Sequence, residues 1–219
     1  MANNVLKVNG IAIASIAKIN GQNDTDLAKL NGEEFTGVTD AHTLISSQTA
    51  SSSSSLSFTS GIDSTYDVYE WHFVNLHPQT DSVYPKFIVS TDGGSSYGVA
   101  TTTTYFRALH GEDDSPAALA YITGYDAAQS ADPMIMGEDV GADNDQSLSG
   151  MMTLYAPSST TYVKHFTFDT QNSNGGDESS RQFIAGYVNT TSAVDAIQFS
   201  FSSGNIDAGE IQMYGVATS

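Results

Sequence analysis

The residues whose types and spacing could best bind a ligand are carboxylates, which lie in two segments that have the composition of loops. Seven acidic residues lie in GEDDS (111–115) and GEDVGADNDQS (137–147). Calcium binds about six to eight oxygen atoms from carboxylates, carbonyls and water, and Asp139, Asp143 and Asp145 are the candidate ligands. The loops lack the glutamate that closes an EF-hand. Calcium is therefore a possible ligand, and no other cofactor is expected. The alternative is that these carboxylates are solvated turn residues.

The remaining acids and bases give no recognisable active site. No two of the five histidines are four residues apart on a predicted helix, which argues against a histidine-based metalloenzyme. Glycoside hydrolysis needs two carboxylates about 5 to 10 Å apart, but Glu70 is the only acidic residue in the middle of a predicted strand, with Glu210 near the start of another. His72 and His165 lie opposite the apolar faces of their strands and would form a polar patch if those strands were neighbours. We predict that the protein is not an enzyme and has no catalytic residues.

The segment STDGGSSY (90–97) matches the Asp-box pattern found in sialidase propellers. A single copy without a blade period cannot make a propeller, so we interpret it as a hairpin turn in which Asp92 accepts backbone N–H hydrogen bonds and Tyr97 packs beneath. Aromatic rings in loops can also stack on sugars, which would make the chain a glycan-binding module. The tyrosines in or near predicted turns are Tyr84, Tyr97, Tyr105, Tyr121 and Tyr125.

The composition indicates that strands, rather than helices, position these side chains. The chain has 219 residues, of which 39% are hydrophobic, and it is rich in Ser, Thr, Asn, Asp and Gly, which weaken helix interiors. It has no cysteine, which excludes disulfides and cysteine-based zinc sites. The formal net charge of −18 repels phosphate, so nucleic acid is not an expected partner. No apolar run approaches the roughly 20 residues that span a membrane, so we expect no membrane insertion.

Alternation of apolar and polar residues predicts nine strands after residue 55. In DAIQFSFSSG, for example, Ile197, Phe199 and Phe201 share one face, and in YDVYEWHFVNL the face of Tyr69, Trp71 and Phe73 is expected to be buried. The other runs are 55–62, 84–90, 100–109, 147–156, 160–170, 181–189 and 209–216. Nine strands without a long helix between them predict an all-β fold, an antiparallel β-sandwich. Residues 110–145, with a helix-like piece at 117–120, are expected to form a long excursion.

The N-terminal segment has a different organisation. Lys, an aliphatic residue, Asn and Gly recur at residues 7–10, 18–21 and 29–32, a period of eleven. Asn-Gly favours either a two-residue hairpin or the end of a short helix, and NDTDLAKLNG is better suited to the helix. We expect residues 1–38 to be a repeat-containing anchor, 39–55 to be a Ser/Thr-rich linker, and 56–219 to be the sandwich.

Each repeat is too small to bury its own aliphatic side chains, so we expect them to pack against another chain. The alternative is an N-terminal extension that packs on its own sandwich. The candidate assembly residues are Ile11, Ile13, Ile16, Ile19, Leu27 and Leu30.

The repeats, the Ser/Thr linker, STDGGSSY and above all the ending FSFSSGNIDAGEIQMYGV resemble virion structural proteins of tailed bacteriophages, especially marine ones. The resemblance covers most of the chain from Leu56 to Val216, with Tyr214-Gly215 its most distinctive part. It implies a jelly-roll type of sandwich, displayed on the virion as a homo-oligomer, expected to be a trimer, and bound to capsid or tail proteins. The position can be that of a head decoration protein or head fibre, or of a tail fibre that binds a host surface glycan. The family has no catalytic residues to transfer.

Overall fold

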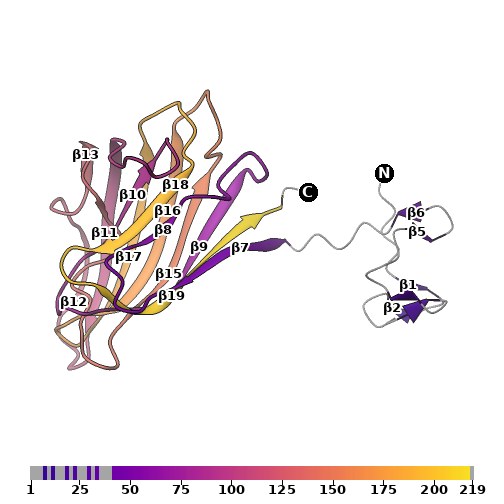
Figure 1. Cartoon of the computed structure of the whole chain (residues 1–219). Coiled ribbons are helices and arrows are strands. Elements are labelled where there is room, and N and C mark those ends of the chain that lie inside the picture. Colours follow the sequence, from indigo (N-terminus) through magenta and orange to yellow (C-terminus); the bar gives the residue numbers. More distant parts are fainter. Residues whose placement is uncertain are drawn as a thin grey trace. The chain divides into compact units, whose positions relative to one another are not determined.

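The computed structural model (Figure 1) describes residues 41–217 and six two-residue strands within the first forty residues. These short strands are β1 (Lys7–Val8), β2 (Ile11–Ala12), β3 (Lys18–Ile19), β4 (Gln22–Asn23), β5 (Lys29–Leu30) and β6 (Glu33–Glu34). The chain divides into two compact units, Met1–Asp40 and Ala41–Ser219.

Each of the three repeats forms an antiparallel hairpin. Val8 pairs with Ile11, Ile19 with Gln22, and Leu30 with Glu33. Two residues therefore separate the paired strands, and Asn-Gly is a favoured sequence for a loop of that length. The expected short helix ending at the third repeat was wrong, because Lys29–Leu30 is a strand paired with Glu33–Glu34.

The larger sheet of the second unit has nine strands. Its order is β12-β11-β17-β16-β15-β9-β19-β7, and β13 also pairs with β11. Every pair is antiparallel. The strands are β7 (His42–Thr49), β9 (Val68–Pro78), β11 (Thr101–Gly111), β12 (Ala117–Tyr121), β13 (Ala127–Ser130), β15 (Leu148–Tyr155), β16 (Lys164–Ser173), β17 (Glu178–Val188) and β19 (Ile206–Val216).

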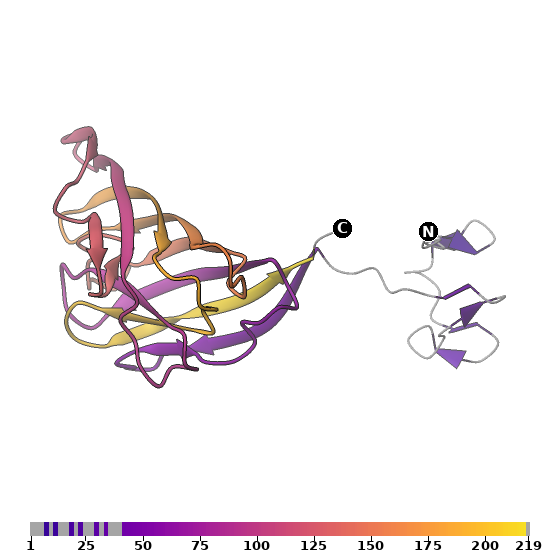
Figure 2. The ribbon, with the colours of Figure 1, turned by 90° about the horizontal axis from the view of Figure 1, so that it is seen from above.

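The smaller sheet has four strands in the order β14-β10-β18-β8. They are β8 (Leu56–Phe58), β10 (Pro85–Ser90), β14 (Met134–Ile135) and β18 (Ala196–Phe201). Figure 2 shows the same unit turned by 90°. Aromatic side chains join the two sheets: the Phe199 ring of β18 lies 5.2 Å from that of Phe73 and 6.5 Å from that of Trp71, measured between centroids. The main core therefore lies between the sheets.

The all-β class and the antiparallel sandwich predicted from the sequence are confirmed, while the jelly-roll type stays a prediction. All nine predicted strands are present. Tyr69, Trp71 and Phe73 are at most 2% exposed, as the alternation indicated.

Two predictions about local structure were wrong. Residues 42–49 of the expected linker form strand β7, which pairs with β19 at the edge of the large sheet, so the sandwich unit begins at Ala41 rather than at residue 56. The helix-like piece at 117–120 lies in strand β12, which pairs with β11. The excursion at 110–145 also contains β13 and β14.

Candidate functional site

The candidate calcium ligands of the acidic loop at 137–147 lie at or near the surface. Asp143 and Asp145 are exposed and Asp139 is half-buried. Among the described residues, no group of three or more His, Cys, Asp or Glu side chains is placed to hold a metal ion. Asp139, Asp143 and Asp145 are therefore not gathered into such a group, and calcium binding by this loop stays a prediction.

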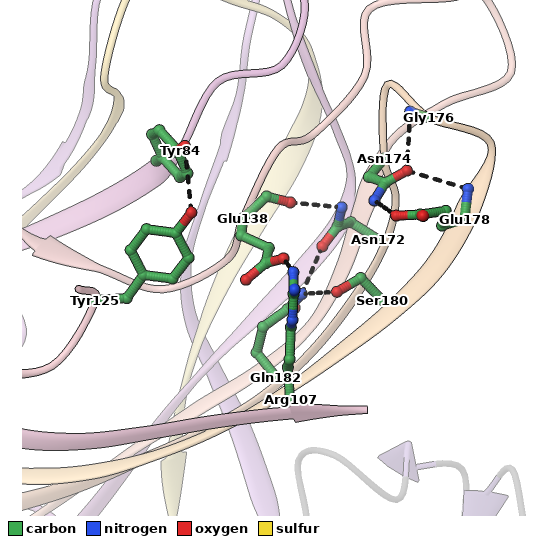
Figure 3. Close-up of polar contacts among 10 residues, drawn as sticks. All are labelled: Tyr84, Arg107, Tyr125, Glu138, Asn172, Asn174, Gly176, Glu178, Ser180 and Gln182. Atoms are coloured by element: carbon green, nitrogen blue, oxygen red, sulfur yellow. Dashed lines mark hydrogen bonds and ion pairs between the residues drawn. The ribbon is translucent and has the colours of Figure 1, made fainter. Parts of the chain in front are cut away.

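The loop instead buries a charge. The Glu138 side chain is fully buried and forms an ion pair with the Arg107 guanidinium of β11, a quarter of whose side chain is exposed (Figure 3). Neither carboxylate oxygen of Glu138 has any further hydrogen-bond partner, and Arg107 Nε is also buried without one. The buried charge of Glu138 therefore depends on Arg107 for its compensation.

A chain of buried amides and hydroxyls attaches the same loop to the β16–β17 hairpin. Asn172 Nδ2 donates to the backbone oxygen of Glu138 at 2.9 Å, and Thr170 Oγ1 donates to that of Met136 at 2.7 Å. Gln182 Nε2 donates to Asn172 Oδ1 at 2.9 Å and to Ser180 Oγ at 2.8 Å (Figure 3). The network fixes the loop's position against the sheet and so provides a structural role for these polar side chains.

The hairpin turn between β16 and β17 is fixed by Asn174. Its Oδ1 accepts hydrogen bonds from the backbone N–H groups of Gly176 and Glu178, and its Nδ2 donates to the Glu178 carboxylate at 2.5 Å (Figure 3). Asn side chains favour turns because they can replace backbone partners in this way. The whole cluster in Figure 3 is consequently a support for the fold rather than an open site.

The loop tyrosines have divided roles. Tyr105 is fully buried, so it is not available to stack on a sugar. Tyr125 Oη donates to Tyr84 Oη at 3.3 Å (Figure 3), and this hydrogen bond, together with burial, raises the pKa of Tyr84. Tyr97 is half-buried. Of the five candidates, Tyr121 alone is strongly exposed, at 51%, and its hydroxyl donates to Asp126.

The segment 90–97 forms the predicted turn, although not within a hairpin. Asp92 Oδ1 accepts from the backbone N–H of Ser96 at 2.8 Å and from the Ser90 hydroxyl at 2.7 Å. The Ser96 and Ser90 hydroxyls, acting on the ionised form, lower the pKa of Asp92 to about 2. Because the flanking strands β10 and β11 belong to different sheets, the turn joins the two layers.

Glu70 contacts imidazole rings. Glu70 Oε2 lies 3.1 Å from His72 Nε2 and 3.1 Å from His42 Nε2. Glu70 and His72 belong to β9 and His42 to β7, and Tyr214 lies on β19, the strand between these two. His165 does not join this group, because β15 separates its strand from β9. His42 was not a candidate from the sequence, since its segment had the composition of a linker.

The outer face of the large sheet, which points away from the small sheet, carries most of the exposed large hydrophobic side chains of the described residues. Of the eight large hydrophobic side chains that are exposed in the described residues, seven lie on this face. They are Leu44, Val74, Phe106, Leu119, Tyr121, Met151 and Tyr155. They belong to β7, β9, β11, β12 and β15, so exposed apolar side chains occur across the width of this face.

A trough crosses this face. Its floor is a row of small side chains on four neighbouring strands, Thr153, Thr167, Ala185 and Thr104. Two adjoining hollows of about 280 and 340 Å³ share Thr104, Thr167 and Ala185. One wall is the row of Met151, Asp169, Phe183 and Phe106, and the other is the row of His165, Tyr187 and Thr102. The trough could not be predicted from the sequence, because only the folded sheet places β11 beside the consecutive strands β15, β16 and β17.

Of the candidate assembly residues, Ile11 lies in β2, Ile19 in β3 and Leu30 in β5. Ile13, Ile16 and Leu27 lie outside the described residues. No helix among the described residues is long and apolar enough to cross a membrane.

The chain was compared with models of protein families, with curated proteins and with solved structures, and none of them matches it.

Proposed function

We propose that the chain is a structural, non-enzymatic component of a tailed-bacteriophage virion. It acts as an oligomeric appendage, expected to be a trimer, whose N-terminal repeats attach it to capsid or tail proteins while the sandwich is displayed. The observation that carries this proposal is the division of the chain into a hairpin-repeat unit and a separate sandwich unit. The resemblance of its sequence to such proteins supports the same assignment.

The hairpins favour assembly because of their size. An isolated two-stranded hairpin is marginally stable in water and needs a further surface against which to bury its apolar side chains. Burying one aliphatic side chain contributes about 1.5 to 3 kcal/mol. The side chains assigned to this contact are Ile11, Ile13, Ile16, Ile19, Leu27 and Leu30.

Light scattering on the 23.2 kDa chain and on a chain lacking residues 1–40 tests this role. The full chain should have a multiple of the monomer mass, and the deletion should lower that multiple. The deletion ends before β7, so the sandwich unit is left entire, and its thermal unfolding serves as the folding control. Equal multiples for the two chains would show that the repeats do not hold the copies together.

Incorporation into virus particles distinguishes attachment to the virion from oligomerisation of the chain alone. Virions are purified from phage whose genome encodes either the full-length protein or a version without residues 1–40. Mass spectrometry should detect the full-length protein in its virions and should not detect the shortened protein. Normal incorporation of the shortened protein would contradict the anchoring role, and absence of the full-length protein would contradict the virion role.

Receptor binding is the second candidate, favoured by the exposed rings of Tyr121 and Tyr162, which are 51% and 72% exposed. Exposed aromatic rings beside polar groups suit the apolar faces and hydroxyls of sugars. A glycan array should then give binding that Tyr121→Ala and Tyr162→Ala reduce, with Tyr105→Phe, a change in the core, as the control.

A further inference from the structure

The outer face of the large sheet has little charge compared with the rest of the molecule. The chain has 25 acidic and 7 basic residues. On the five neighbouring strands β9, β15, β16, β17 and β11, the outward-facing acidic residues are Glu70 and Asp169. Asp169 forms an ion pair with Arg181, and Glu70 is next to two histidines. Two copies of so acidic a chain repel one another over most of their surface, and this face is where they can approach at the smallest electrostatic cost.

The same face carries a ridge parallel to the trough. The ridge is the wall formed by Met151, Asp169, Phe183 and Phe106, in which Asp169 is paired with Arg181. The rings of Phe183 and Phe106 stack at 5.1 Å between centroids. The guanidinium of Arg181 lies over the Phe183 ring, with Cζ 4.9 Å from its centroid. The rings therefore stand in a row and support one another. The Phe106 ring and the Arg181 guanidinium already stack on Phe183, so this ring is less open to a sugar than a free aromatic platform.

Ridge and trough lie side by side, two residues or about 7 Å apart along each strand. Phe183 and Ala185 are neighbours in this sense on β17, as are Phe106 and Thr104 on β11. A two-fold axis that runs parallel to both, midway between them, places the ridge of each copy over the trough of the other. Phe183 then meets Ala185 of a second copy, and Phe106 meets Thr104. A surface on which one row of large side chains adjoins one row of small ones is self-complementary in the way that a two-fold interface requires.

We propose that this face is a two-fold interface with a second copy of the chain, in which the Phe106–Phe183 ridge of each copy occupies the trough over Ala185 of the other. The size of the face is adequate. Its five strands are eight to eleven residues long, and with a strand spacing of about 4.8 Å they span roughly 24 by 33 Å, close to the roughly 800 Å² per partner of a stable interface.

Ala185→Arg tests the proposal on the full-length protein. Ala185 is exposed, so the change should leave the fold intact while it places a charge and a long side chain in the trough. Ala118→Arg on β12 is the matched control, because Ala118 is also exposed and pairs with Leu109, whose side chain faces the core. Sedimentation equilibrium should show that Ala185→Arg halves the mass of the assembly, or weakens its dissociation constant at least tenfold, while Ala118→Arg leaves both unchanged. Phe183→Ala should weaken the association in the same direction, and thermal unfolding should show that all three variants are folded.

The proposal is overturned if Ala185→Arg associates as tightly as the wild type, or if the wild type shows no two-fold association at about 100 µM. A monomeric protein that binds glycans and loses that binding on Ala185→Arg would instead identify the trough as a sugar site. If the repeats hold three copies together, a two-fold contact through this face joins two such trimers. The two tests stay separate, because the role of the repeats depends on the effect of deleting residues 1–40 and that of this face on the effect of filling the trough.

Discussion

The ion pair between Arg107 and Glu138 is asymmetric, because Glu138 is fully buried whereas a quarter of the Arg107 side chain reaches the surface. Removing either partner leaves the other uncompensated, but water can reach only the arginine. We therefore expect Arg107→Met to cost about 3 to 5 kcal/mol of unfolding free energy, and Glu138→Gln to cost less, about 1 to 3 kcal/mol. Urea unfolding of the two variants measures this difference. Equal losses would mean that the two charges are equally hydrated in the folded protein.

The lowered pKa of Asp92 predicts that the stability of the protein depends on pH in the acidic range. Its pKa is about 2 in the folded protein, below the ordinary value of 3.8, so the folded state favours the ionised carboxylate. The resulting stabilisation is fully present above about pH 4 and is lost as the pH falls toward 2. The melting temperature of the wild type should therefore exceed that of Asp92→Asn at pH 6, and the gap should narrow between pH 4 and 2. A gap that stays constant over this range would show that the turn does not depend on the charge.

At the level of single residues, the sequence identified turn chemistry better than burial. The backbone contact of Asp92 could be predicted because a local pattern specifies it, whereas the Ser90 hydroxyl bond was not foreseen. The burial of Glu138 could not be predicted, because its partner Arg107 is 31 positions earlier and only the folded sheet brings the two together. Its neighbours in sequence, Asp139, Asp143 and Asp145, share its composition but stay at or near the surface.

Among the elements, β19 contains a glycine that the packing requires. A Cβ on Gly215 would overlap the ring of Tyr66, which itself packs edge-on against Tyr69. We expect Gly215→Ala to destabilise the protein by about 1 to 3 kcal/mol, the usual cost of overpacking. Gly124→Ala is the control, because a Cβ there would have no neighbour within 4 Å. Thermal unfolding should give a lower melting temperature for Gly215→Ala than for Gly124→Ala. Similar melting temperatures would show that the Tyr66 ring moves aside freely.

The strands that the sequence predicted are those with one fully buried face. Period-two alternation is strong in β9 and β18 because every second side chain enters the core. β7 was missed since it lies at the edge of the sheet, where HTLISSQT buries little and has the composition of a linker. β12 was missed because its alanines favour a helix locally, and pairing with β11 overrides that preference.

For the whole molecule, the charge of −18 makes any self-association depend on salt. The Debye length falls from about 30 Å at 0.01 M to about 10 Å at 0.1 M ionic strength, so added salt screens the repulsion between copies. Association through a face with little charge should therefore strengthen as sodium chloride rises from about 0.01 to 0.3 M. Sedimentation equilibrium at several salt concentrations measures this. Weakening with salt would show that ion pairs between copies hold the assembly together.

The pairing of β7 with β19 places the two ends of the sandwich unit side by side. His42 pairs with Val216, and the Ala217 N–H donates to the Ala41 oxygen at 3.1 Å. A force that pulls Ala41 and Ala217 apart would open this ladder one rung at a time, as in a zipper. A force applied at Ala41 along the direction of β7, and resisted by the rest of the sheet, would load all the β7–β19 hydrogen bonds at the same time, in shear. The same hydrogen bonds therefore resist a force along β7 better than a force that separates β7 from β19. A pull on Ala41 along the strand, resisted by the sheet, meets the greater resistance.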